Sequence, residues 1–141
     1  MVSASRVEFL DRSMPSPVVI LLHTLPDGSS HYDWLTSLPG RDEVGLVAFR
    51  LDVSPLEPGW SRLMAVRMPD HRRLYLKYEG AVSGGRGDVR RVAAGECLAW
   101  EEREGEIVAE LAFEGVRVEI RARRIDRERW ELIKVTPEVG G

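Results

Sequence analysis

The sequence predicts a mainly β protein, a single-domain antiparallel β-barrel with short helical turns. Short runs rich in β-branched and aromatic residues follow one another along the chain, and turns that contain glycine or proline separate them. No segment shows the apolar period of an amphipathic helix. The length of 141 residues suits one domain with its own core, so residues 1–141 are expected to form one unit.

The first half of the chain begins with a weakly patterned lead-in over residues 1–16. Four strands are expected here, at Arg6–Leu10, Val18–His23, His31–Leu38 and Val44–Asp52. The sequence Pro26-Asp27-Gly28-Ser29 is a turn signal between the second and third of them. The proline-rich stretch Val53–Pro69 is expected to form a loop with one helical turn at Ser61–Val66.

The second half, after the glycine-rich segment Ser83–Gly87, is expected to form a meander of short strands. These strands are expected at Asp88–Ala93, Cys97–Glu102, Glu106–Phe113, Val116–Arg124 and Arg129–Val135. Apolar and charged residues alternate over Val116–Arg121, which is the pattern of a sheet with one buried face. The four tryptophans are expected in the core or at its edge, rather than as platforms for stacked bases.

Composition excludes several classes of protein. The single cysteine, Cys97, rules out an internal disulfide framework and a cysteine-cluster zinc site. No run approaches the roughly 18 apolar residues of a membrane span, and no export signal is visible, so a cytoplasmic monomer is expected. The net charge of -3 argues against a protein that coats nucleic acid non-specifically, although a local site for one or two phosphates remains open.

Imidazole chemistry in this chain must use His23, His31 or His71, because these are its three histidines. Strand alternation places His31 and Asp33 on one face, and a hairpin before them would return His23 beside them. Two imidazoles and a carboxylate form a common ligand set for a catalytic divalent metal. The candidate ligands are His23, Asp33 and His71, with His31 as a phosphate donor or an acid–base group. Alternatively, all three histidines are ordinary hydrogen-bonded residues.

Two further segments have a functional and a structural interpretation. The glycine-rich Ser83–Gly87 either presents N–H groups and Arg86 to a phosphate or forms a flexible hairpin turn. The charged segment Arg121–Arg129 is either a solvated strand end and turn or a contact for the nucleic-acid backbone.

The order of these motifs resembles the 3′-phosphoesterase module of bacterial DNA ligase D, which also occurs as a stand-alone protein. The matching stretches are Val19–Trp34, Leu46–Leu51 and Asp70–Val89, ordered blocks that are spread over about half of the chain. The resemblance implies a compact β-barrel with a groove that holds a divalent metal, usually manganese, with zinc and cobalt as other possibilities. It also implies removal of a 3′-terminal ribonucleoside or 3′-phosphate from nucleic-acid ends, DNA or RNA.

Position by position, the resemblance implies metal ligands at His23, Asp33 and His71. It implies a contact from His31 to the scissile phosphate, and Tyr75 matches the tyrosine of the family's His-x-x-x-Tyr motif.

Glu79 matches a family position that is structural or supports the ligands rather than binding the metal. Leu35 stands where the family usually has an arginine, and either Arg50 or Arg86 would have to supply that charge.

The resemblance leaves other functions open. A DNA ligase or repair polymerase is a possible partner for the enzyme. The alternative function is a catalytically inactive β-barrel module that binds nucleic-acid ends or a DNA-repair protein. A third interpretation is a barrel without a functional site, in which the histidines are incidental.

Overall fold

The computed structural model describes residues 8–9, 15–39 and 45–135, and it confirms the mainly β fold class. The strands are β1 (Glu8–Phe9), β2 (Ser16–Thr24), β3 (Ser30–Thr36), β4 (Leu46–Leu51), β5 (Arg62–His71), β6 (Gly80–Ala81), β7 (Asp88–Arg103), β8 (Glu106–Phe113), β9 (Val116–Arg124) and β10 (Arg129–Val135). One short 3-10 helix, η1, covers Arg73–Leu76. Within the described ranges, no helix is long and apolar enough to cross a lipid bilayer.

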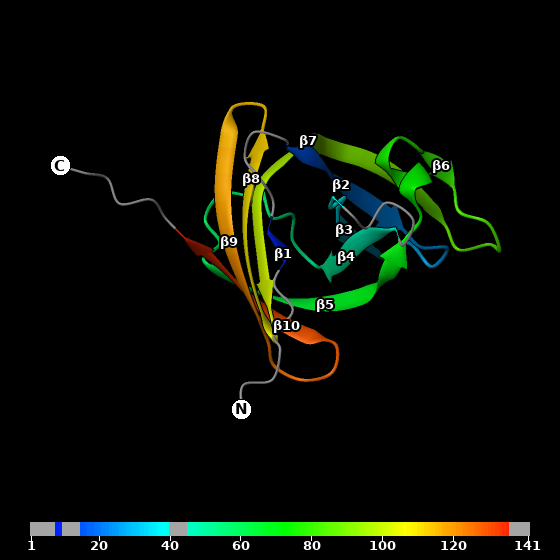
Figure 1. Ribbon diagram of the computed structural model, residues 1–141. Coiled ribbons are helices and arrows are strands. Elements are labelled where there is room, and N and C mark those ends of the chain that lie inside the picture. The colour runs from blue at the N-terminus through cyan, green and yellow to red at the C-terminus, as the bar shows by residue number, and fades with distance from the viewer. Residues whose placement is uncertain (1–7, 10–14, 40–44, 136–141) are drawn as a thin grey trace.

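The strands form one antiparallel sheet whose pairings close into a ring (Figure 1). The order is β1-β7-β2-β3-β4-β5-β10-β9-β8, and a further pairing of β7 with β8 joins the two ends. The short strands β1 and β6 each pair with β7. Closure gives every strand of the ring a neighbour on both sides, so the ring has no free edge strand.

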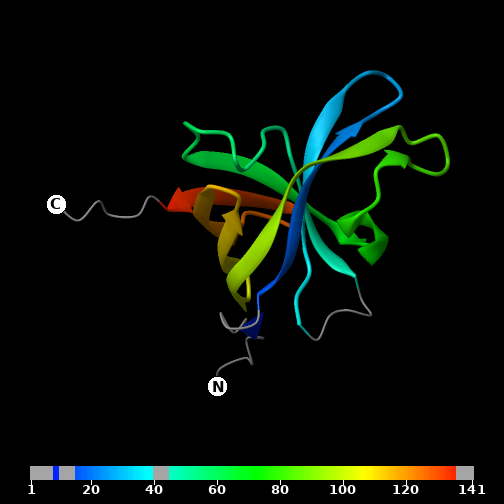
Figure 2. The ribbon, with the colours of Figure 1, turned by 90° about the horizontal axis from the view of Figure 1, so that it is seen from above.

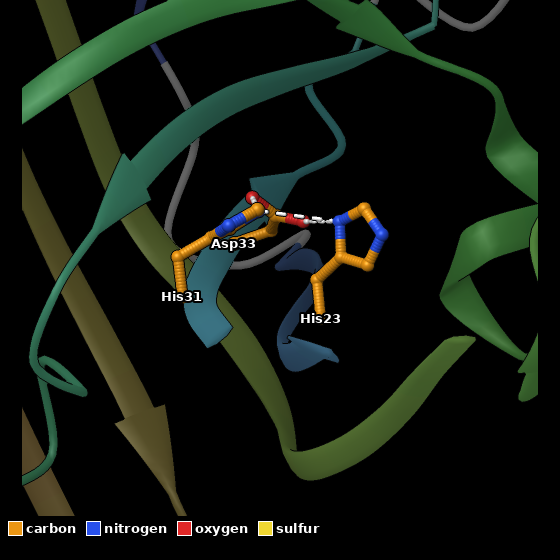
Figure 3. A group of neighbouring side chains, drawn as sticks. All are labelled: His23, His31 and Asp33. Carbon is orange, nitrogen blue, oxygen red and sulfur yellow. Dashed lines mark hydrogen bonds and ion pairs between the residues drawn. The ribbon is translucent and has the colours of Figure 1, made fainter. Parts of the chain in front are cut away.

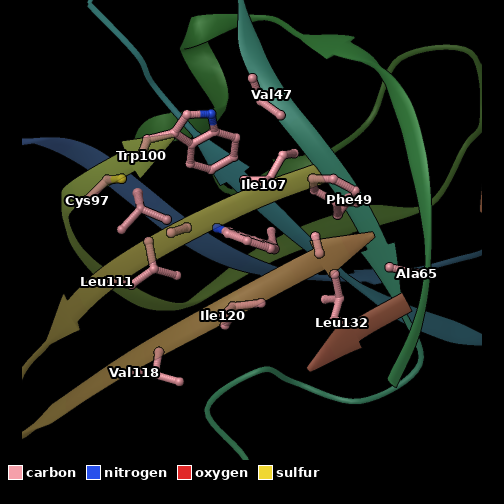
Figure 4. Packing of buried hydrophobic residues seen from close by; sticks show 14 of the residues in the cluster. Val47, Phe49, Ala65, Cys97, Trp100, Ile107, Leu111, Val118, Ile120 and Leu132 are labelled. Atoms are coloured by element: carbon pink, nitrogen blue, oxygen red, sulfur yellow. The ribbon is translucent and has the colours of Figure 1, made fainter. Parts of the chain in front are cut away.

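The main core lies inside the ring and is built from alternate side chains of the ring strands (Figure 4). Trp34 is its centre: the ring centroids of Trp34 and Phe49 lie 5.3 Å apart, and Trp100 lies 6.0 Å from Trp34. Trp60 is partly buried and packs against this core, which agrees with the expectation that the tryptophans lie in the core or at its edge. Cys97 is also buried here, and burial raises the pKa of its thiol to about 12, which makes it an unreactive structural residue.

A second, smaller core lies on the outer face of β2, β3 and β4. Its buried members are Val19, Leu21, Leu35, Leu46, Ala48, Val82 and Val89. Helix η1 and the segment that leads into β7 cover this face, because Tyr75, Leu76 and Val82 pack against the strands. Burial on both faces explains why β2 is a continuous apolar run rather than an alternating one.

The prediction of a loop at Val53–Pro69 with a helical turn at Ser61–Val66 is wrong over the second part of this stretch. Strand β5 begins at Arg62 and pairs with both β4 and β10. Pro69 is tolerated because it falls where the register with β4 shifts, and a proline without an N–H can occupy such an irregular position. Partners remote in sequence therefore override the local breaking signals.

The two strands expected at Asp88–Ala93 and Cys97–Glu102 are also wrong as separate elements, because they form the single strand β7. Gly95 marks a close approach between strands rather than a turn. A Cβ atom at Gly95 would lie 2.2 Å from the carbonyl oxygen of Ala112 in the neighbouring strand β8.

The remaining strand predictions agree with the structure, and the strand expected at His31–Leu38 ends at Thr36. Much of the lead-in over residues 1–16, most of the strand expected at Arg6–Leu10, and Val44 lie outside the described residues.

Candidate metal centre

The β2–β3 hairpin brings two histidines and a carboxylate onto the outer face of the sheet. His23 pairs directly with His31, and Asp33 lies two residues further along β3, so alternation points all three side chains the same way. Trp34 points inward into the main core. The structure thus confirms the expected hairpin and the expected common face.

The hairpin turn is fixed by its own side chains. The carboxylate of Asp27 accepts hydrogen bonds from the backbone N–H of Ser29, at 2.9 Å, and from its hydroxyl, at 2.6 Å. These two bonds lower the pKa of Asp27. Gly28 adopts a φ of 90°, which favours glycine. This turn sets the register that places His23 opposite His31.

The three side chains converge closely (Figure 3). His23 Nδ1 lies 3.2 Å from His31 Nε2, and the carboxylate of Asp33 lies 3.3 Å from His31 Nε2 and 3.9 Å from His23 Nδ1. Metal–ligand bonds of about 2.1 Å at tetrahedral angles set donor atoms about 3.4 Å apart. The group His23, His31 and Asp33 could therefore hold a divalent metal ion.

Burial favours the neutral form of His31. His31 is 6% exposed and Asp33 is 3% exposed, whereas His23 is partly open. Burial lowers the pKa of His31; nearby Arg50 and His23 lower it further, while the charge of Asp33 opposes them. His31 is therefore neutral near pH 7, which is the form of imidazole that can bind a metal or donate one hydrogen bond.

The lowered pKa of His31 predicts a pH-dependent stability for the metal-free protein. Below the unfolded pKa of about 6.5, the unfolded chain binds a proton that folded His31 resists, so stability is complete above this pH and falls below it. The urea midpoint in EDTA should drop between about pH 7.5 and about pH 5.5, and the drop should be smaller in His31→Gln. An equal drop in both proteins would contradict this assignment.

A groove of about 920 Å³ opens beside this group. Six of the residues expected at the site line it: His23, Asp33, Arg50, His71, Tyr75 and Arg86. The seventh, His31, is buried next to His23 and Asp33. The fold thus brings residues of β2, β3, β4, β5, η1 and the loop before β7 together at this groove.

His71 lies at the end of β5, outside the close group of His23, His31 and Asp33. Its Nδ1 is 3.0 Å from the carbonyl oxygen of Pro69. Because a carbonyl oxygen only accepts, Nδ1 of His71 donates and Nε2 of the neutral ring keeps its lone pair. His71 is thus a groove residue, and its role as a ligand stays a prediction.

Leu35, at the position where the resemblance implies an arginine, lies in apolar surroundings. Its side chain is fully buried in the second core, between Val19 and Ala48 on the neighbouring strands. Arg50 lies two pairs further along, directly opposite Asp33, and lines the groove. It is the guanidinium that the sheet register places nearest to the carboxylate.

The guanidinium of Arg86 is turned toward its own loop. Its Nε donates to the carbonyl oxygen of Ser83 at 2.8 Å, and Nη2 lies 3.3 Å from the Ser83 hydroxyl.

The Glu79 carboxylate accepts a hydrogen bond from the backbone N–H of Arg91 at 2.8 Å, which is a structural contact.

Sequence reasoning missed Arg72, which also lines the groove. Its guanidinium carbon lies 6.0 Å from the centroid of the Tyr75 ring. Its position directly after His71 was the available signal.

The fold and the site define a β-rich protein with a His–His–Asp group at the side of an arginine-containing groove. No protein-family model matches the chain, and a search of characterised proteins found no match.

Proposed function

We propose that this protein is a metal-dependent phosphoesterase that acts on nucleic-acid 3′ ends, built on a closed β-barrel. One observation carries the proposal: a single groove is lined by His23, Asp33, His71 and Arg50, with His31 buried beside them. Ligands for a divalent cation and a guanidinium for phosphate oxygens therefore share one pocket. The substrates are ends that carry a 3′-phosphate or a 3′-ribonucleoside.

The donor chemistry fits manganese, and also zinc or cobalt, because nitrogen and carboxylate oxygen donors suit all three metals. When bound, the cation supplies charge neutralisation at a phosphate oxygen. His23 and Asp33 belong to both possible ligand sets, and His71 or His31 completes the set. Arg50 provides the bidentate donor for the remaining phosphate oxygens.

The charges of the groove favour a phosphate terminus over a long duplex. Arg50, Arg72 and Arg86 line it together with Asp27, Asp33 and Asp70, so its fixed charges nearly balance before a cation binds. A divalent cation would tip this balance toward anion binding at one place. The net charge of -3 gives the chain no broad attraction for nucleic-acid backbone.

The activity test uses labelled oligonucleotides that end in a 3′-phosphate or in one 3′-ribonucleotide, incubated with the protein and Mn²⁺. We expect a 3′-hydroxyl end from the first, and from the second a shortened 3′-phosphate end that is then converted to a 3′-hydroxyl end. EDTA should abolish both reactions. A 5′-phosphate oligonucleotide is the control and should stay intact. Folded protein without turnover in Mn²⁺, Zn²⁺ or Co²⁺ would refute the proposal.

The ligand set can be resolved by calorimetry with Mn²⁺. With His71 as the third ligand, His71→Ala should lose metal binding, whereas His31→Ala should keep it and lose phosphate release. The opposite pattern would assign the third ligand to His31.

The second candidate function is a catalytically inactive module that binds nucleic-acid ends or a repair protein such as a ligase or polymerase. Leu35 in place of an arginine and the engagement of Arg86 with Ser83 favour it. In that case the protein should bind a 3′-phosphate oligonucleotide without releasing its phosphate.

A further inference from the structure

The glycine-rich loop Ser83–Gly87 contacts the candidate metal centre through its main chain. His23 Nε2 lies 2.7 Å from the carbonyl oxygen of Arg86, although the two residues are 63 positions apart. A carbonyl oxygen cannot donate, so Nε2 of His23 carries the proton. In the neutral ring, Nδ1 then carries a lone pair and no proton, and this atom faces His31 and Asp33.

The loop is fixed in this position by close packing against the hairpin. Gly87 has a φ of 88°, and a Cβ atom there would lie 1.9 Å from the carbonyl oxygen of Thr24. The carbonyl oxygen of Gly87 accepts a hydrogen bond from the N–H of Val82 at 2.8 Å, which closes the loop at its base. Only glycine permits this approach, so the identity of residue 87 sets the distance between Arg86 and His23.

We infer that the Ser83–Gly87 loop is a positioning element of the metal centre, in which the Arg86 carbonyl holds His23 in the Nε2–H tautomer. This inference rests on the proposed metal-dependent function. Metal-bound histidines are usually oriented by a hydrogen bond from the other ring nitrogen, and loss of such a partner weakens metal binding by about 10- to 100-fold. The role belongs to the main chain of Arg86, because its guanidinium is bound to Ser83.

The contact between His23 and the Arg86 carbonyl also determines the direction of the hydrogen bond between His23 and His31. With Nδ1 of His23 as an acceptor, the 3.2 Å contact requires His31 Nε2 to be the donor. In the metal-free protein, the protons of both rings are thus directed by one carbonyl group, and a cation bound at Nδ1 of His23 would take the place of the His31 proton.

The first test reads the tautomer in the metal-free protein by long-range nitrogen–proton NMR of ¹⁵N-labelled histidine. His23 is assigned by the signals missing from His23→Gln. We expect the Nε2–H tautomer for His23; an Nδ1–H tautomer or a mixture of the two would overturn the inference. This measurement needs no metal and no activity, so it stands or falls separately from the proposed function.

The second test compares Gly87→Ala with Gly84→Ala by calorimetry with Mn²⁺. Both glycines have a positive φ, 88° and 77°, but a Cβ at Gly84 meets only the Nε atom of Arg86 at 3.8 Å. Gly84→Ala is therefore a matched control for backbone strain in the same loop.

Gly87→Ala should bind Mn²⁺ about 10- to 100-fold more weakly and lose the single tautomer of His23, while Gly84→Ala should stay within about twofold of the wild type. Equal affinities in the two variants would overturn the inference. If Gly87→Ala does not fold, the tautomer of the wild type decides alone. If the wild type binds no Mn²⁺, the proposed function fails, and the tautomer decides only whether the Arg86 carbonyl holds His23.

Discussion

Asp33→Asn should abolish Mn²⁺ binding and slow release of a 3′-phosphate by about 10³-fold or more. The amide keeps the shape of the side chain but removes the negative charge next to His23 and His31. A bound cation contributes several kcal/mol to stabilisation of phosphoryl transition states, and about 1.4 kcal/mol corresponds to a factor of ten. Calorimetry with Mn²⁺ and single-turnover assays on a 3′-phosphate oligonucleotide measure the two effects.

Asp88→Asn is the control for the loss of a carboxylate near the site. Asp88 pairs with Thr24 at the start of β7 and is exposed, but it does not line the groove. This variant should bind Mn²⁺ and react as the wild type does. Unchanged Mn²⁺ affinity in Asp33→Asn would remove Asp33 from the ligand set and with it the proposed metal centre.

Trp34→Ala should cost about 3–5 kcal/mol of unfolding free energy, the range for deletion of a large buried aromatic side chain. Trp34 is 1% exposed at the centre of the ring core, where Phe49 and Trp100 contact it. Domains of this kind have a total stability of about 5–15 kcal/mol, so this loss would leave little. Urea unfolding followed by circular dichroism measures it.

Trp34→Phe separates packing from polar effects. The indole Nε1 of Trp34 has no hydrogen-bond partner within the described part of the chain. Replacement by Phe therefore breaks no hydrogen bond to the described residues and keeps an aromatic ring in contact with Phe49 and Trp100. Trp34→Phe should thus be clearly more stable than Trp34→Ala, and equal stability would contradict the role of ring packing.

The close group of the site could be predicted from the sequence because it is local. His31 and Asp33 share a face through the period of a strand, and the turn at Asp27 and Gly28 returns His23 to them. These relations need only backbone geometry and turn chemistry over a few residues.

The features that the sequence did not predict depend on contacts between segments that are far apart along the chain. Strand β5 forms because β4 and β10 pair with it through backbone hydrogen bonds, and no local sequence pattern predicts those partners. Gly95 has the signal of a turn, but the close approach of β8 determines its role. The register pairs His71 with Leu46, whereas Asp33 lies opposite Arg50 near the other end of β4. The contact from Arg86 to His23 spans 63 positions. Such features require the folded ring.

Figure 2 shows the long strand β7 running from beside the β2–β3 hairpin to strand β8, and this path has a consequence for the order of folding. Strands β2, β3, β4 and β5 pair in sequence order, whereas β7 must return to β2 from a distant part of the chain and also pair with β8. Non-local pairings form late because the entropy of closing the chain is paid before their contacts are gained. The hairpin with His23, His31 and Asp33 can thus form early in folding. The Arg86 carbonyl reaches His23 only when β7 docks, so the site becomes complete at the step that closes the ring.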